Sequence, residues 1–380
     1  LTQKNQTPKS DWLNFVVTSK ARNKIKSYLR EEQAKHTRMG REELERKLKN
    51  WKFTLTIDEA VAYLAKYFKL RLGTEVYALI ATQKLDFGSI KEILSRHLSG
   101  EAEEERRAAP AVKAARPKAL IPVFPGTNCE YDTQRALLEA GADAGQFIIR
   151  NLTSADVADS VERFAKAVKD SQIIVIPGGF SGGDEPDGSA KLITAFFRNA
   201  AVKEQVTDLL EKRDGLMLGV CNGFQALIKL GLVPYGKIMD TDADFPTLTY
   251  NVIGRHQSRL VRTRVCSNKS PWLAGTKVGD IYTVPISHGE GRFLASEELV
   301  KKLAENGQIA TQYVDLDGYA TMDAAFNPNG SICAIEGITS PDGRVLGKMG
   351  HSERIGQNLY RNVPGEKDQK IFESGVAYFQ

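Results

Sequence analysis

Several features that mark other classes of protein are scarce in this sequence of 380 residues. It has four cysteines and no C-x-x-C pair, so neither a zinc site nor a disulfide framework is indicated, and a cytoplasmic setting is expected. It has no run of about 18 apolar residues, so neither a transmembrane helix nor contact with a membrane is expected. It also lacks a glycine-rich phosphate loop with a partner lysine, which argues against nucleotide binding of the P-loop type.

Charge is distributed unevenly along the chain. Residues 1–118 carry 25 Lys and Arg against 15 Asp and Glu, whereas the remainder carries 27 against 32. A basic first part and an acidic second part indicate two modules with different partners.

The first part reads as a small all-α domain over residues 1–98. Apolar residues recur at helical spacing, and a helix near 41–51 has three Glu-to-Lys or Glu-to-Arg pairs at i,i+4. Thr56 with Glu59 and Ser89 with Glu92 are capping-box patterns. We therefore expect four or five short helices and no strand of consequence. Residues 99–117, rich in Glu, Arg, Ala and Pro, are predicted to be a linker.

The second part, residues 118–380, alternates short apolar runs with helical patterns. Such alternation predicts a mostly parallel sheet covered by helices on both faces. From about residue 258 the apolar segments are typical of additional antiparallel strands. The strands and the helix on which these expectations depend are 119–124, 172–176 and 216–220, the helix 222–230, and the later segments 260–265, 281–286, 332–338 and 345–349.

The strongest local signal is the pattern G-x-C-x-G at residues 219–223, placed between a strand and a helix. A nucleophile on such a turn projects above the sheet, and the flanking glycines let the backbone pass without a clash. The positive end of the helix is expected to favour the thiolate of Cys221, and the Asn222 amide can donate to an oxyanion. A buried structural cysteine beside two packing glycines is the alternative.

A thiol nucleophile needs a base and a group that orients the base. His351 and Glu353 follow the predicted strand 345–349. In extended backbone, side chains at i and i+2 point the same way, so Glu353 can contact the His351 ring. Taken alone, a surface histidine beside an acid explains this pair equally well.

Together, the cysteine turn and the later His-x-Glu resemble class I glutamine amidotransferases. Residues 177–181 (Pro-Gly-Gly-Phe-Ser) resemble the family's glycine-rich oxyanion strand. Residues 125–129, 287–292 and 327–331 resemble the glutaminase domain of phosphoribosylformylglycinamidine synthase. Many members read His-Pro-Glu, and this chain has Ser352 in place of the proline. The resemblance covers residues 117–380 and implies a flavodoxin-like α/β fold.

The resemblance also implies what the site residues do. Cys221 would attack the side-chain amide of glutamine, His351 would carry the proton to the leaving ammonia, and Glu353 would hold His351. Amides near Gly179 and Phe180, together with that of Asn222, would stabilise the oxyanion. Two further residues, Gln225 and His288, are candidates for substrate contact, although helix packing and a glycine-rich turn explain them as well. Cys129 is expected near the pocket but not as a second nucleophile.

Partners and cofactors follow from the same resemblance. The chain is expected to supply ammonia to a synthetase domain or subunit in purine biosynthesis. ATP and Mg²⁺ would be used by that synthetase, which the sequence lacks, so no cofactor and no metal is expected in this chain. Another cysteine hydrolase of similar topology, such as a peptidase-like relative, is a weaker alternative.

The basic first part has a resemblance of its own. Residues 11–22 and the run 24–33 resemble the segment that follows the TGS domain in RelA/SpoT stringent-response proteins, with residues 1–10 as the tail of that domain. This resemblance implies a regulatory region that meets RNA or the ribosome. A stripe formed by Arg22, Lys26 and Arg30 suits phosphate contacts, although a solvated basic face is the plain alternative. The chain is thus expected to be a fusion of two modules.

Overall fold

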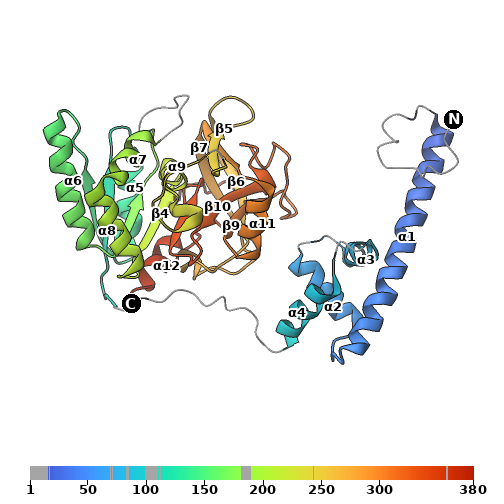
Figure 1. Ribbon diagram of the computed structural model, residues 1–380. Coiled ribbons are helices and arrows are strands. Elements are labelled where there is room, and N and C mark those ends of the chain that lie inside the picture. The colour runs from blue at the N-terminus through green and yellow to red at the C-terminus, as the bar shows by residue number, and fades with distance from the viewer. Residues whose placement is uncertain are drawn as a thin grey trace. The chain divides into compact units, whose positions relative to one another are not determined.

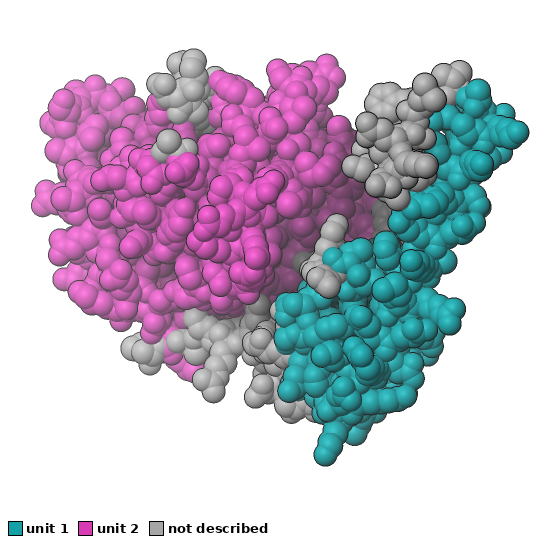
Figure 2. All heavy atoms as spheres, turned by 45° about the vertical axis from the view of Figure 1, so that its right-hand side comes forward, with its two compact units in different colours: residues 1–104 teal, residues 105–380 magenta. Residues whose placement is uncertain are grey.

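The computed structural model describes residues 16, 18–68, 70, 72–82, 85–98, 110, 113–180, 190–242, 244–356 and 358–380. The chain divides into two compact units, residues 1–104 and 105–380, which we call the N-terminal and C-terminal units (Figure 2). Most of the predicted linker, 99–109 with 111 and 112, lies outside the described residues, as do residues 1–15 and 17. No helix within the described ranges is long and apolar enough to cross a membrane.

The described part of the N-terminal unit consists of helices, as predicted. The four are α1 (Ser19–Asn50), α2 (Ile57–Tyr67), α3 (Gly73–Ala81) and α4 (Phe87–Leu98) (Figure 1). The expectation of short helices was wrong for α1, which runs unbroken for 32 residues. Helix α3 crosses α1 at Gly40, where an added Cβ would lie 1.9 Å from the Tyr77 carbonyl oxygen. Gly40 therefore serves close helix packing and does not end the helix.

The two predicted capping boxes had different outcomes. Thr56 and Glu59 form the reciprocal pair, because the Thr56 amide donates to Glu59 Oε2 at 2.8 Å and the Glu59 amide donates to Thr56 Oγ1 at 3.3 Å. This box is confirmed. Helix α4 already begins at Phe87, so Ser89 lies inside the helix and the second predicted box was wrong.

The C-terminal unit is built on a nine-stranded mixed sheet (Figure 1). Its strands, in spatial order, are β2 (Asp143–Ile148), β1 (Lys118–Val123), β3 (Ile173–Ile176), β4 (Leu216–Val220), β11 (Val345–Lys348), β10 (Ile335–Thr339), β9 (Ile309–Tyr313), β6 (Gln257–Val265) and β7 (Ile281–His288). A separate ribbon pairs β5 (Thr247–Tyr250) with β8 (Glu290–Leu294). Strands β3 and β4 are buried along their whole length, which explains why they read as uninterrupted apolar runs.

The predicted antiparallel direction of one strand was right on one edge only, and the difference matters for the site. The segment near 345–349 was grouped with the antiparallel strands, but β11 runs parallel to β4, with Lys348 beside Val220. On its other edge β11 is antiparallel to β10. Strand β11 therefore joins the two parts of the sheet, and its carboxyl end lies beside the carboxyl end of β4. Cys221 and His351 both follow these ends.

Helices cover both faces of the parallel part of the sheet. The crossovers before and after β2 run in opposite directions across the sheet, so right-handed connections place α5 on one face and α6 on the other. Helix α12 packs against α5, whereas α6, α7, α8 and α9 form a connected layer. The helices described in the C-terminal unit, α10 and α11 included, are α5 (Glu130–Glu139), α6 (Ser154–Lys169), α7 (Lys191–Arg198), α8 (Ala200–Glu211), α9 (Asn222–Leu230), α10 (Leu232–Tyr235), α11 (Glu297–Glu305) and α12 (Ile371–Ala377).

Candidate active site

The cysteine turn has the geometry that its sequence predicts. Cys221 follows β4, precedes α9 and has φ 53° and ψ −105°, a left-handed backbone that non-glycine residues rarely adopt. A Cβ at Gly223 would lie 2.0 Å from the Ile176 carbonyl oxygen, and one at Gly219 would lie 2.6 Å from the Gly223 carbonyl oxygen. Glycines at both positions therefore let α9 return closely over the sheet and hold Cys221 in its strained turn.

The predicted electrostatics of the thiol were only partly right. Burial raises the pKa of the Cys221 thiol to about 12, with the nearby Cys129 and Glu353 acting in the same direction. A hydrogen bond from the Asn222 amide lowers it, as expected at a helix N-terminus, but does not prevail. The resting group is thus a neutral thiol and not the expected thiolate. It needs a base at the moment of attack.

The base and its partner lie together just beyond β11. His351 Nδ1 and Glu353 Oε1 are 2.6 Å apart, and both side chains are almost completely buried. Burial raises the pKa of Glu353, but the charge that His351 carries when it is protonated and the hydrogen bonds from His351 and the backbone outweigh it, so that the pKa is lowered overall. An ionised carboxylate only accepts, so the proton resides on Nδ1. This leaves a lone pair on the buried Nε2, which has no hydrogen-bond partner among the described residues.

Gly178 lies against both the thiol side and the histidine side of the site. A Cβ there would be 2.7 Å from His351 Cε1, 3.5 Å from Cys221 Cβ and 3.0 Å from Cys129 Sγ. In this structure the Cys221 thiol is directed to the Ser287 carbonyl oxygen, at 3.7 Å, and is not hydrogen-bonded to His351. Catalytic hydrogen bonds are often formed only when substrate is bound. Gly178 therefore lies between the cysteine turn and the His351 ring, where any side chain would push the two apart.

The predicted oxyanion donors differ in how they are placed. The Asn222 amide points at the Cys221 sulfur. The Phe180 amide already donates to the Gly126 carbonyl at 2.8 Å, so its predicted role is not supported in this conformation. The Gly179 amide has no backbone acceptor among the described residues, and Gly179 itself forms an isolated bridge with Thr127. Asn222 and Gly179 remain the candidate donors, and Ser181 lies outside the described ranges.

A small pocket opens at the thiol. It is lined by Gly179, Phe180, Cys221, Gln225 and residues 287–290. The Gln225 side chain is engaged at both ends, since Asn222 Nδ2 donates to its Oε1 at 2.8 Å and its Nε2 donates to the Glu290 carbonyl at 2.6 Å. Gln225 thus ties the helix α9 to the start of β8. A direct substrate contact by Gln225 stays a prediction.

His288 is buried in the wall of this pocket. Its Nδ1 lies 3.1 Å from Asn251 Oδ1, and its Nε2 has no hydrogen-bond partner among the described residues. Burial lowers the pKa of His288 to about 3, with the charges of His351 and His256 acting in the same direction. His288 is therefore neutral at physiological pH. Its predicted place beside the substrate agrees with the lining of the pocket, and its contact with substrate stays a prediction.

Two further residues lie beside His351: Cys129, which was expected near the pocket, and Arg354, which was not predicted as part of the site. Cys129 Sγ lies 3.8 Å from His351 Nδ1, and Arg354 donates to that sulfur at 3.0 Å. Burial raises the pKa of Cys129 to about 12, so it is not a ready second nucleophile. Cys129, His351 and Glu353 also place one potential metal-ligand atom each within 4.8 Å of one another, but the Arg354 guanidinium beside the sulfur opposes a cation there. The only sequence signal was that Arg354 adjoins the His-x-Glu pattern.

The three basic residues proposed for nucleic-acid contact belong to the other unit. Arg22, Lys26 and Arg30 are exposed on α1, at the expected spacing of four residues. Residues 11–15 and 17 of the segment that carries the RelA/SpoT resemblance lie outside the described ranges, as do residues 1–10, and most of the rest of that segment lies at the start of α1.

Comparisons with known proteins agree with this geometry. Residues 116–379 match the family described as CobB/CobQ-like glutamine amidotransferase domain. The phosphoribosylformylglycinamidine synthase subunit PurQ of Gloeobacter violaceus is 35% identical over 263 residues, which cover 68% of this chain and 97% of that subunit. The PurQ subunit of Aquifex aeolicus is 32% identical over 250 residues, 65% of this chain and 95% of that subunit.

Among solved structures, a chain of PurLQS from Thermotoga maritima is 25% identical, with a TM-score of 0.49 over 70% of this chain and all of that one. The family match spans well over half of the sequence, and it ends within one residue of the C-terminus. It includes every residue of the cysteine turn and of the His351–Glu353 pair. The chain therefore belongs to the CobB/CobQ-like glutamine amidotransferase family, in the group of PurQ-type subunits.

Proposed function

We propose that this chain hydrolyses the side-chain amide of glutamine and supplies the ammonia to a phosphoribosylformylglycinamidine synthase in purine biosynthesis. The observation that carries the proposal is the buried His351–Glu353 pair, 2.6 Å apart, at the end of the strand parallel to the one that ends in Cys221. A base with its orienting carboxylate beside a strained nucleophile is what amide hydrolysis through a thioester requires.

The first half of the reaction forms a thioester. Glutamine places its amide carbon at the Cys221 sulfur, and the thiol proton passes to His351 Nε2 as the sulfur–carbon bond forms. The Asn222 and Gly179 amides donate to the resulting oxyanion. When the carbon–nitrogen bond breaks, the nitrogen takes the proton from His351 and leaves as ammonia.

The second half returns the enzyme to its starting state. Water gives a proton to His351 Nε2 and attacks the thioester carbon. The carbon–sulfur bond then breaks, the sulfur regains its proton from His351, and glutamate is released. Glu353 stays ionised throughout because its pKa is lowered, so it keeps the Nδ1–H tautomer of His351 in both halves.

The partner in this proposal is a synthetase that consumes the ammonia. Support comes from the relatives, each of which is named a subunit of phosphoribosylformylglycinamidine synthase, which implies at least one further subunit. ATP and Mg²⁺ belong to that synthetase in our proposal, and this chain needs neither for hydrolysis. The cytoplasmic setting expected from the scattered cysteines is part of the same proposal.

A glutamine-directed diazo-ketone tests the proposal directly. We expect it to alkylate Cys221, as read by peptide mass spectrometry, and we expect Cys221→Ala to abolish both the labelling and the release of ammonia. Cys333→Ala, which removes an exposed cysteine, is the matched control and should retain both. Absence of labelling at Cys221, even with a synthetase subunit added, would show that the site does not bind glutamine productively.

A second candidate function concerns the N-terminal unit alone. The exposed stripe of Arg22, Lys26 and Arg30 on α1 supports phosphate contact with RNA, as the RelA/SpoT resemblance implies. The expected result is RNA binding that weakens steeply with salt and is lost when all three residues are replaced by Glu. Binding that is equally strong in the triple variant, or absent at low salt, would reject the stripe as an RNA site.

A further inference from the structure

A buried ion pair that the proposed reaction does not use lies directly behind the histidine loop. Lys348, the last residue of β11, and Glu336 in β10 are each 1% exposed, and Lys348 Nζ lies 3.6 Å from Glu336 Oε1. Removing two charges from water is costly, and an apolar replacement of such a pair is often as stable. Stability alone therefore does not account for the pair, and its other contacts indicate what it does.

The pair binds the backbone on both sides of His351. The Gly350 amide donates to Glu336 Oε1 at 2.6 Å, and Lys348 Nζ donates to the Gly350 carbonyl at 2.9 Å. Lys348 Nζ also donates to Ser352 Oγ at 2.9 Å. Gly350 and Ser352 are the two neighbours of His351 in the sequence, so the ion pair fixes the loop immediately before and immediately after the base.

Lys348 also binds the nucleophile's backbone. The Cys221 amide donates to the Lys348 carbonyl at 2.8 Å, as the parallel pairing of β4 and β11 requires. One residue thus holds the cysteine turn through its carbonyl group and the histidine loop through its ammonium group. Lys348 thus contacts the backbone on both sides of the reactive pair.

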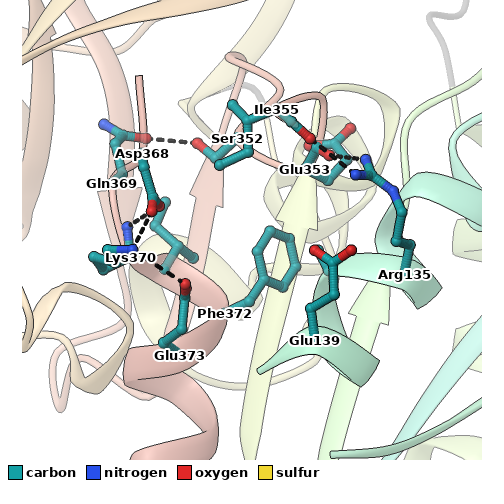
Figure 3. A pocket seen from close by; sticks show the side chains of 12 residues that line it. Arg135, Glu139, Ser352, Glu353, Ile355, Asp368, Gln369, Lys370, Phe372 and Glu373 are labelled. Carbon is teal, nitrogen blue, oxygen red and sulfur yellow. Dashed lines mark hydrogen bonds and ion pairs between the residues drawn. The ribbon is translucent and has the colours of Figure 1, made fainter. Parts of the chain in front are cut away.

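The remaining contacts complete the network and account for Ser352. Thr311 Oγ1 donates to the second oxygen of Glu336. Ser352 Oγ accepts a hydrogen bond from Lys348 and donates one to Gln369 Oε1 at 2.5 Å. Figure 3 shows this bond between Ser352 and Gln369 at the edge of a pocket. A proline at position 352 has no hydroxyl and could make neither bond. Ser352, which replaces the proline of the His-Pro-Glu pattern, therefore connects Lys348 to the residue that follows His351.

We propose that Lys348 is a positioning residue for glutamine hydrolysis. With Glu336 as its counter-ion, it fixes the Gly350–Ser352 backbone, so that the His351 ring stays between Glu353 and the Cys221 thiol. This inference rests on the proposed function for its kinetic test, and a spectroscopic test keeps the two separable.

The decisive variant removes both charges together, because a single replacement leaves a buried charge without its partner. In the full-length chain, Lys348→Met combined with Glu336→Gln keeps the side-chain volumes and keeps an acceptor for the Gly350 amide. We expect the double variant to fold, to keep KM for glutamine within about twofold, and to lose about 10- to 100-fold in kcat, because misplacing a catalytic group costs rate and not binding. An unchanged kcat overturns the proposal.

A matched control lies at the opposite end of the same strand. Arg344 and Asp214 form an ion pair of 2.9 Å just before β11 begins, far along the strand from His351. Arg344→Met combined with Asp214→Asn should therefore leave kcat within about twofold of the original. An equal loss of kcat in this control would show that any ion pair along β11 has the same effect, and would also overturn the proposal.

A second readout does not depend on turnover. In ¹⁵N-histidine spectra, the proton on His351 Nδ1 is expected far downfield, and it should vanish or shift in the double variant but persist in the control. If the unaltered chain releases no ammonia, the proposed function fails while this signal still decides the positioning role. If the double variant does not fold, Ser352→Ala decides instead: a kcat about threefold lower at unchanged KM supports the proposal, and an unchanged kcat overturns it.

Discussion

The two sides of the active site are built in different ways. On the cysteine side, a buried apolar strand, two glycines and a helix place Cys221, and the contacts that hold it are mainly backbone contacts, among them those with Ile176 and Lys348. On the histidine side, charged side chains bind the backbone around His351, among them Glu336, Lys348 and Arg135. The cysteine side is thus held by close backbone packing, whereas the histidine side is held by polar side-chain contacts.

This difference predicts how each side fails. The closely packed cysteine turn tolerates no added volume, so a methyl group forced into it should displace the whole turn and abolish activity. A polar assembly loses its members one at a time, so its variants should remain folded and lose rate by degrees. Four experiments, ordered from the largest expected effect to the smallest, test this contrast.

The largest effect is expected from Gly223→Ala on the cysteine side. The new methyl group would lie 2.0 Å from the Ile176 carbonyl oxygen, so α9 must move away from β3 and β4. We expect ammonia release to fall below detection and the free energy of unfolding to drop by about 3 kcal/mol or more. Thermal unfolding and an ammonia assay measure both. Gly145→Ala in β2, where an added Cβ meets nothing within 4 Å, is the control and should change neither.

The second experiment measures the resting state of the thiol. Because its pKa is raised from 9.0 to about 12, less of Cys221 is ionised at any pH below 9 than in a free cysteine. Each pKa unit is a factor of ten, so a small neutral alkylating agent should react about 10³-fold more slowly at pH 8 than with an unperturbed thiol. The rate should still rise above pH 9, where a normal thiol levels off. A plateau near neutral pH would mean that the helix N-terminus prevails over burial.

Glu353→Gln tests the histidine side. A glutamine amide can donate to Nδ1, which would move the proton to Nε2 and remove the lone pair that accepts the thiol proton. We expect kcat to fall on the order of 10²- to 10³-fold with little change in KM and in thermal stability. Steady-state kinetics measure the first two quantities. Wild-type turnover in this variant would remove Glu353 from the mechanism.

The smallest effect is expected from Arg135→Ala. Arg135 on α5 donates to the carbonyls of Glu353 and Ile355, at 3.0 and 2.9 Å, and Figure 3 shows it reaching across to that loop. Losing two such bonds should lower kcat by about three- to tenfold. Arg163→Ala on α6, which removes an exposed helix arginine bound to Asp159, is the control and should leave kcat unchanged. Equal effects in both variants would argue that surface charge, and not the loop contact, is responsible.

The same contrast explains what could be predicted from the sequence. The strand 216–220 and the helix 222–230 were predicted with the bounds that the structure shows, because an apolar run and a helical repeat are each recognised within a few residues. His351 and Glu353 were found as a pair because they are two residues apart. The Lys348–Glu336 pair was missed, because a lysine inside an apolar strand gives no sign of the carboxylate that it meets in the folded sheet.

Other misses have the same origin. The long helix α1 was divided in the prediction because the packing of Gly40 against α3 has no local signature. The parallel pairing of β11 with β4 was not predicted, because the order of strands in a sheet is a property of the whole chain and not of any segment. The Phe180 amide was predicted as a free donor because its acceptor, the Gly126 carbonyl, lies in a separate loop.

The pairing of β11 with β4 has a consequence for how the chain can be divided. All of the antiparallel strands lie between Cys221 and His351 in the sequence, yet the two residues follow neighbouring strands. A break in the exposed connection at Thr241 would give two fragments, each with one half of the reactive pair and one unpaired strand edge. Neither fragment alone could hydrolyse glutamine, and activity would return only when β4 and β11 paired again. The site is thus suited to a split enzyme, whose turnover reports that two pieces have met.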